Sequence, residues 1–160
     1  MMGDFTRLPR SALTIPLWLA FGGCAPPASP PATAPPKGSL AMRVTAAEFQ
    51  WRIRYPGPDE KLDTSDDVLA RRHLHLPAET RVAIDLRSED YVYSFFLPHI
   101  DLMEVAVPDI PFELVFETAT PGIHELLGSQ MCGYTHPELL GDVVIHTPND
   151  FETWLSGVRE

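Results

Sequence analysis

The chain has 160 residues, 44% of them hydrophobic. A chain of this length and composition suits one globular domain with its own core and leaves little room for a second. Its formal net charge is -10 at pH 7, from 22 acidic and 12 basic side chains. This charge argues against nucleic acid as a partner and is explained most simply by a solvated acidic surface.

Residues 1–24 are predicted to be an export signal. Arg7 and Arg10 precede an apolar run over residues 13–21, which is too short to span a bilayer. The run leads through glycine into Cys24, an ending that resembles the lipobox of bacterial lipoproteins, in which the cysteine receives a lipid. We expect Cys24 to be lipidated and to anchor an exported protein to a membrane, in the bacterial periplasm or at the cell surface. The alternative is an ordinary signal peptide that is cleaved nearby.

Residues 25–38 consist mostly of Pro and Ala. This composition cannot bury a core and favours an extended, semi-rigid polyproline conformation. The segment is therefore predicted to be a tether that holds a folded domain, residues 39–160, away from the membrane surface. No part of that domain is apolar enough to cross a bilayer.

Apolar residues of the predicted domain recur with the period of β-strands. Alternation is clear over residues 49–55, 82–86 and 112–116. Further short apolar runs, separated by Pro, Gly and Asp, cover residues 73–76, 91–97, 104–107 and 142–146. The spacing indicates an all-β protein, with the strands in an antiparallel sandwich.

One helix is predicted to close the chain. Asn149 is placed to cap its N-terminus, and Glu152 stands where a capping box has its acidic residue. Phe151, Trp154 and Leu155 share one face and form an apolar stripe that can pack on the sandwich.

Cys132 is the sharpest chemical signal in the sequence. If Cys24 is lipidated, Cys132 has no cysteine partner, and a lone thiol in an oxidising compartment is a liability unless it is buried or holds a metal. His136 follows four residues later across a loop that contains glycine. Thiolate and imidazole at this spacing suit copper or zinc. The alternative is a buried, inert cysteine beside a surface histidine.

Several separate motifs carry a family resemblance. They comprise Gln50, Trp51, Tyr55, Pro56 and Gly57; residues 74–77 and 81–88; Asp90, Val92, Ser94, Phe95 and Pro98; Gly122, Cys132, Gly133 and His136; and the closing helix. From about residue 49 to residue 155 the chain resembles the soluble CuA domain of cytochrome c oxidase subunit II. The resemblance implies a cupredoxin-like Greek-key β-sandwich with a short C-terminal helix. It also implies that Trp51 belongs to an aromatic patch that accepts electrons from cytochrome c.

The dinuclear copper centre of that family uses a pair of bridging Cys, a pair of His, a Met and a backbone carbonyl from Glu. By position, Tyr93 replaces the first His, Gly128 the first Cys, Gln130 the Glu and Leu139 the Met, whereas Cys132 and His136 remain. One thiolate cannot bridge two copper ions in the family's manner. The resemblance therefore implies that a standard CuA centre is absent and that a single copper ion is the expected cofactor. The Gln130 carbonyl keeps its ability to coordinate, because it belongs to the backbone.

Tyr93 is a candidate third ligand because the resemblance places it facing the loop. A phenol has an unperturbed pKa of about 10, although a nearby copper ion favours the phenolate. The alternative is that Tyr93 is a core aromatic that fills the space of the missing His. The other candidates for completing the site are His99, Met103, Glu104 and Met131.

Residues 57–67 are rich in Asp and resemble an insert found in many bacterial members of the family. Such a cluster has the oxygen ligands that calcium prefers. A solvated acidic turn is the simpler interpretation.

We therefore expect an exported subunit II-like cupredoxin that binds one copper ion for electron transfer or copper handling. Its expected partners are a redox protein such as cytochrome c, or a haem-copper oxidase. The alternative is a copper-free accessory or structural subunit of such an oxidase. The chain is not expected to be catalytic alone, because His136 has no evident nucleophile and carboxylate beside it.

Overall fold

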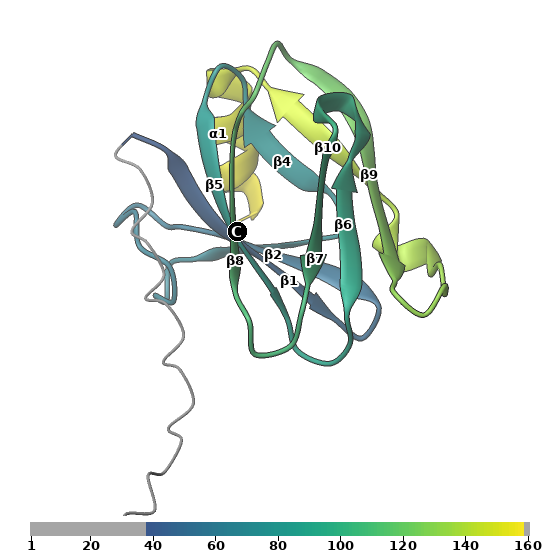
Figure 1. The fold of residues 1–160 in the computed structure, drawn as a ribbon. Helices are drawn as coiled ribbons and strands as arrows, with labels where there is room; N and C mark the ends of the chain where they lie inside the picture. The colour runs from purple at the N-terminus through teal and green to yellow at the C-terminus, as the bar shows by residue number, and fades with distance from the viewer. Residues whose placement is uncertain (1–37, 159–160) are drawn as a thin grey trace, which may run out of the picture.

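The computed structural model describes residues 38–158, which form two facing β-sheets with a short helix at one end (Figure 1). The elements are β1 (Leu40–Ala47), β2 (Gln50–Tyr55), β3 (Val68–Arg71), β4 (Leu74–Pro77), β5 (Arg81–Ser88), β6 (Tyr93–Leu97), the 3-10 helix η1 (Pro98–Ile100), β7 (Leu102–Ala106), β8 (Phe112–Glu117), β9 (Gly122–Gln130), the 3-10 helix η2 (Pro137–Leu139), β10 (Gly141–His146) and α1 (Pro148–Val158). The predicted export signal, Cys24 and nearly all of the predicted tether lie outside the described residues.

The strand order is β3-β2-β1-β5-β8 in the first sheet and β4-β10-β9-β6-β7 in the second. These sheets confirm the predicted all-β sandwich with a short C-terminal helix. The expectation of a wholly antiparallel arrangement was wrong at two places, because β1 pairs with β5 and β4 with β10 in parallel. Parallel neighbours need a long crossover, and the chain passes through β2, β3 and β4 before it returns beside β1.

The core lies between the sheets and follows the alternation of apolar residues in the sequence. Every second residue of β2 and β6 is buried, because successive side chains of a strand point to opposite faces. Trp51, Tyr55, Tyr93 and Phe95 are among the largest side chains that are fully buried. The rings of Trp51 and Phe95 meet edge to face with centroids 5.2 Å apart. This aromatic core gives the domain its rigid centre.

Helix α1 is capped by Thr147, two residues earlier than predicted. The Thr147 hydroxyl accepts a hydrogen bond from the Asp150 backbone N–H at 3.3 Å and donates one to the Asp150 carboxylate at 2.7 Å. Pro148 is the first helical residue, a position that suits proline because its missing N–H would have no partner there. Asn149 lies inside the first turn, so its predicted role as the cap was wrong.

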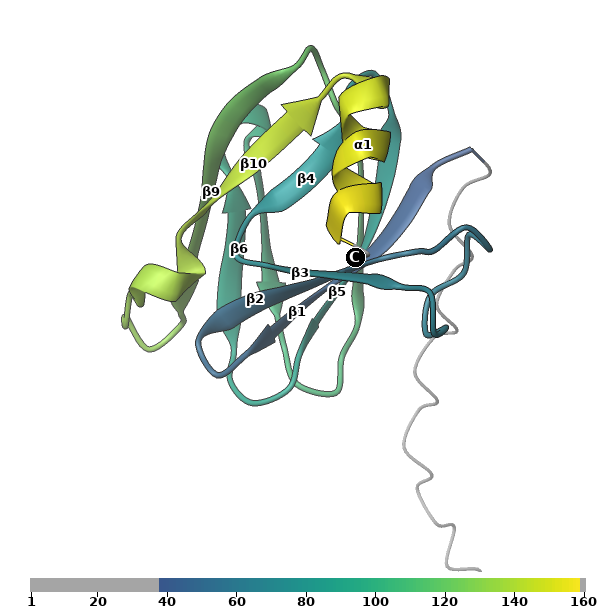
Figure 2. The same ribbon diagram turned by 180° about the vertical axis from the view of Figure 1, so that it is seen from behind.

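The helix packs across one end of the sandwich, next to β4 (Figure 2). Its Trp154 ring stacks on the His75 imidazole at 4.1 Å and meets Tyr55 edge to face at 5.1 Å. His75 in turn has its Nδ1 2.8 Å from Nε2 of His146, the last residue of β10. Within residues 38–158, no helix has the length and apolar character needed to cross a membrane.

Candidate metal site

The loop that joins β9 to β10 stands out from the end of the sandwich (Figures 1 and 2). Its first turn is held by hydrogen bonds from Gly133 N–H to the Gln130 carbonyl at 3.0 Å and from Gln130 N–H to the Tyr134 carbonyl at 2.9 Å. Gly133 has a φ of +86°, which a residue without a Cβ adopts readily. Cys132 lies in this turn as an exposed free thiol. The structure therefore rules out the alternative of a buried, inert cysteine.

His136 is half-buried in the second part of the same loop. Its Nδ1 accepts a hydrogen bond from the Glu138 backbone N–H at 3.4 Å, which caps η2. Its ring stacks on Phe49 with centroids 5.4 Å apart. Because Nδ1 accepts this hydrogen bond, the neutral ring carries its proton on Nε2, and a metal ion that binds His136 must displace the Glu138 N–H from Nδ1 or move the ring proton there.

Gln130 is the last residue of β9 and lies opposite Tyr93 of β6. Its carbonyl oxygen accepts the Gly133 N–H that closes the turn. A carbonyl oxygen has a second lone pair, so coordination by Gln130 stays a prediction. Its geometry is fixed by the turn that also carries Cys132.

Tyr93 is fully buried, and its hydroxyl already has two partners. It donates to the Asp90 carboxylate at 2.8 Å and accepts from the Phe49 backbone N–H at 3.3 Å. Burial, and next the hydrogen bond to Asp90, raise the pKa of Tyr93 to about 12. The phenol is thus protonated at neutral pH and holds the backbone around it together. These contacts favour the core-aromatic interpretation, and ligation by Tyr93 stays a prediction.

Trp51 fills the interior behind the loop. Its side chain is fully buried, and its indole N–H donates to the Leu139 carbonyl at 2.9 Å. A Cβ placed on Gly128 would lie 2.8 Å from the Trp51 ring and 2.9 Å from the Leu139 carbonyl oxygen. The positions that resemble the family's first Cys and its Met are therefore packed against an indole. Trp51 itself does not reach solvent, and its predicted role in accepting electrons stays a prediction.

The other candidate ligands do not gather at Cys132. Met131 is the exception because it adjoins Cys132 in the loop and is 59% exposed. His99 instead stacks on His124, Met103 is an exposed residue of β7, and Glu104 accepts a hydrogen bond from the Val105 backbone N–H. Within the described part of the chain, no three His, Cys, Asp or Glu side chains are grouped so that they could hold a metal ion. The residues present do not fit a dinuclear copper centre.

Two residues for which the sequence predicts no role at the site, Phe49 and Asp90, organise this end of the domain. Phe49, predicted to lie in a strand, occupies the two-residue turn between β1 and β2, with a φ of 61°. Asp90 accepts hydrogen bonds from the Glu48 and Tyr91 backbone N–H groups and from Tyr93. Although burial opposes it, these bonds lower the pKa of Asp90. Nothing in the sequence marks Phe49 as a turn residue, because such turns favour Asn and Gly.

Ion pairs connect the Asp-rich segment, residues 57–67, to the first sheet. The Arg43 guanidinium lies 2.7 Å from the Asp63 carboxylate, and Arg54 lies 2.9 Å from Asp67. The Thr64 hydroxyl donates to Asp66 at 2.7 Å. These carboxylates are used within the protein, which favours a structural acidic turn over a calcium site.

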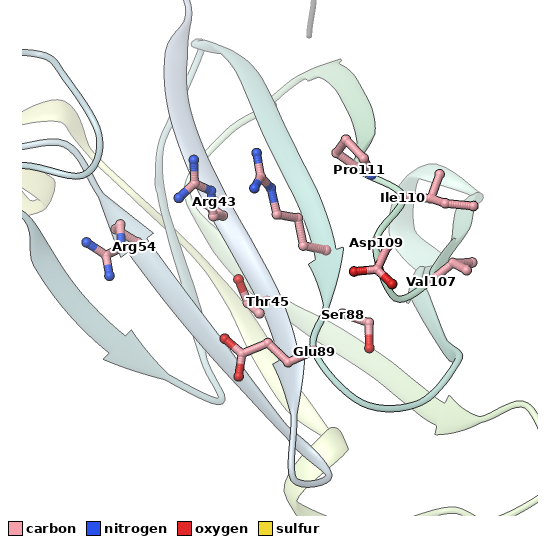
Figure 3. Close-up of a pocket in the computed structure, with 10 residues that line it drawn as sticks. Arg43, Thr45, Arg54, Ser88, Glu89, Val107, Asp109, Ile110 and Pro111 are labelled. Atoms are coloured by element: carbon pink, nitrogen blue, oxygen red, sulfur yellow. The ribbon is translucent and has the colours of Figure 1, made fainter. Parts of the chain in front are cut away.

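A polar groove of about 480 Å³ lies on the outer face of the same sheet (Figure 3). Its lining includes three arginines and the loop that contains Asp109; the arginines are Arg43, Arg54 and Arg87. Asp85 joins two of the guanidinium groups, at 2.8 Å from Arg43 and 2.9 Å from Arg87. The groove contains none of the predicted metal ligands, and its charges largely neutralise one another.

Comparison with known proteins gives no matching family model. The chain is 29% identical over 115 residues to cytochrome c oxidase subunit 2 of Thermostichus vulcanus, covering 72% of this chain and 32% of that protein. It is 24% identical over 142 residues to alternative cytochrome c oxidase subunit 2 of Bradyrhizobium diazoefficiens, covering 75% of this chain and 51% of that protein. It is also 23% identical over 121 residues to probable quinol oxidase subunit 2 of Staphylococcus saprophyticus, covering 76% of this chain and 30% of that protein.

The chain thus spans about a third of the length of the first of these relatives. Among solved structures, the periplasmic domain of subunit II of cytochrome oxidase from Bradyrhizobium japonicum matches with a TM-score of 0.65 and 18% identity, covering 78% of this chain and 96% of that one. Strand architecture, sequence similarity and structural match agree with the resemblance seen in the sequence. The described residues form a cytochrome c oxidase subunit II-like domain, with the fold of that subunit's periplasmic part.

Proposed function

We propose that this domain handles copper by holding one Cu(I) ion at a time on the β9–β10 loop. The observation that carries the proposal is the placement of an exposed Cys132 thiol and a half-buried His136 on one turn-stabilised loop. Met131 adjoins Cys132 in the same loop and is exposed. Thiolate, thioether and imidazole are ligands that suit Cu(I).

Exposure favours copper handling over electron transfer. A copper ion bound at Cys132 would be open to solvent and to a partner protein, which suits capture and release. Binding would release the thiol proton of Cys132 to solvent, because the thiolate is the ligand. His136 would bind through the lone pair of Nδ1, which would displace the Glu138 N–H, while Nε2 keeps the ring proton.

The proposed setting is the outside of a bacterial membrane, within reach of a haem-copper oxidase that needs copper. The predicted export signal, lipidation at Cys24 and the tether of residues 25–38 support this setting. The tether would act as a spacer between the membrane anchor and the folded domain.

A copper-free accessory subunit is the second candidate, and one observation favours it. Gly128 and the Leu139 carbonyl, at positions where the resemblance places two of the family's copper ligands, lie against the Trp51 indole, which leaves no room for a side chain at residue 128. A protein that acts only through contacts with an oxidase needs no ligands at this position. The relative named as a quinol oxidase subunit 2 makes this a concrete alternative.

A competition titration distinguishes the two candidates. The domain from Ser39 onward contains the whole described core and is titrated with Cu(I) against a chromophoric chelator in the absence of oxygen. We expect tight uptake in the wild type, abolished in Cys132→Ser and weakened in His136→Ala. Thr135→Ala changes an exposed residue of the same loop and serves as the matched control. Equal uptake by wild type and Cys132→Ser would contradict copper handling and favour the copper-free subunit.

A further inference from the structure

The turn between β1 and β2 adopts an unfavourable backbone conformation. Ala47 pairs with Gln50, so Glu48 and Phe49 form a two-residue turn, and both have positive φ values of 52° and 61°. Turns of this type favour Asn-Gly, because a left-handed residue with a larger side chain is disfavoured by about 1–2 kcal/mol. Strain of this kind persists only where the surroundings enforce it.

Hydrogen bonds from a neighbouring loop hold the turn in place. The Glu48 backbone N–H donates to the Asp90 carboxylate at 2.8 Å, and the Phe49 N–H donates to the Tyr93 hydroxyl at 3.3 Å. Tyr93 donates to Asp90 in turn, at 2.8 Å. These contacts involve backbone atoms of the turn and would be kept by Asn or Gly at either position. They therefore do not explain why a phenylalanine is present at residue 49.

The contacts of the Phe49 side chain explain why a phenylalanine is present at this position. The ring lies between Tyr91 and His136, stacked on both, with centroid distances of 5.5 Å and 5.4 Å and an interplanar angle of 28° in each case. His136 is thereby held from two directions, by Phe49 on its face and by the Glu138 N–H at Nδ1. Its ring plane is therefore fixed before any ligand arrives.

We propose that Phe49 is a positioning residue for His136, whose ring plane it fixes on the loop that also carries Cys132. This inference rests on the proposed function, since it assigns Phe49 a role at the copper-handling loop. Residues that orient a metal-binding imidazole affect affinity by about 10-fold to 100-fold when they are replaced. The left-handed backbone at Phe49 is the conformation that brings a ring on a tight turn against that imidazole.

The test uses three variants of the domain from Ser39 onward. Phe49→Asn removes the ring and relaxes the backbone, because Asn tolerates a left-handed conformation. Glu48→Asn relaxes the same turn and leaves the ring in place, so it is the matched control. Phe49→Tyr restores an aromatic ring. We expect Cu(I) affinity to fall about 10-fold or more in Phe49→Asn and to stay unchanged in the other two. The thermal midpoint of Phe49→Asn should stay close to that of the wild type.

A second readout on the metal-free domain does not depend on copper. The ring-proton NMR resonances of His136 should be shifted upfield in the wild type by the Phe49 ring and should move downfield only in Phe49→Asn. If the wild type binds no Cu(I), the proposed function fails, and this shift still decides whether Phe49 positions His136. Unchanged His136 resonances in Phe49→Asn would overturn the inference, as would unchanged Cu(I) affinity in a wild type that binds.

Discussion

Gly128 lies against the indole of Trp51, at the position where the related family has its first bridging cysteine. The indole N–H is bonded to the Leu139 carbonyl, so ring and backbone hold each other in place. A side chain at residue 128 would therefore collide with the indole and with the Leu139 carbonyl oxygen.

Gly128→Cys should lower the free energy of unfolding by about 1–3 kcal/mol, since overpacking forces the neighbouring groups to move. It should not bind a second copper ion. Chemical denaturation and metal analysis of the purified domain measure both effects. Ser129→Cys is the control, because it adds a thiol on the same strand, facing Ser94 rather than Trp51. A stable Gly128→Cys variant with two copper ions per chain would contradict this account of the packing.

Tyr93→Phe should also be destabilising, by about 1–3 kcal/mol, because it leaves the Phe49 N–H without its partner and Asp90 with one fewer donor. Copper binding should change little in comparison. Urea denaturation and the Cu(I) titration separate the two effects. A variant of normal stability that loses copper would instead make the phenol a ligand.

At the scale of the elements, helix α1 packs through Trp154 against two neighbouring histidines, His75 and His146. Burial, and next the proximity of His146 and His73, lower the pKa of His75 to about 4. His146 is also shifted down, by burial, although Asp150 opposes this. Both imidazoles are therefore neutral at pH 7, and Trp154 stacks on a neutral ring.

The domain should lose stability as the pH falls from about 6.5 to about 4. In this pH window His75 is protonated in the unfolded chain but stays neutral in the folded protein. Lowering the pH therefore favours unfolding. The full contribution is present above pH 6.5. Urea unfolding at several pH values, followed by Trp fluorescence, measures the slope. His75→Phe keeps a ring under Trp154 and should flatten the dependence, and an equally steep slope in this variant would exclude His75 as its source.

The start of α1 gives a second prediction at the level of the element. Thr147→Ala should lower the free energy of unfolding by about 1 kcal/mol, because the backbone N–H of Asp150 loses its acceptor. Asn149→Ala is the matched control and should be close to neutral. If thermal or chemical denaturation showed a larger loss of stability in Asn149→Ala than in Thr147→Ala, Asn149 would be the true cap.

Across the whole molecule, the sequence predicts the fold better than the site. Alternating apolar residues located the strands of the sandwich, because a strand with one buried face has an apolar residue at every second position. Parallel pairing of β1 with β5 was missed, since nothing local in either strand encodes its partner. The Thr147 cap was missed because Asn149 and Glu152 offer a capping pattern two residues after the one formed by Thr147 and Asp150.

The site was less predictable because it depends on contacts between distant segments. The sequence identified Cys132 and His136 from their spacing and chemistry. It could not show that Trp51, from β2, would fill the space beside Gly128, or that Phe49 would reach His136 from the opposite sheet. Both contacts join residues more than 75 positions apart in the chain, as the hydrogen bond between Trp51 and Leu139, 88 positions apart, also does.

Native mass spectrometry of the domain from Ser39 onward, loaded with excess Cu(I) and then desalted, tests the central claim most directly. We predict a mass increase of one copper ion per chain, which disappears in Cys132→Ser. A mass increase of two copper ions would mean that the dinuclear centre forms despite the packing of Trp51 against Gly128. Retention of no copper, or equal retention by Cys132→Ser, would contradict the proposal that this loop holds a copper ion.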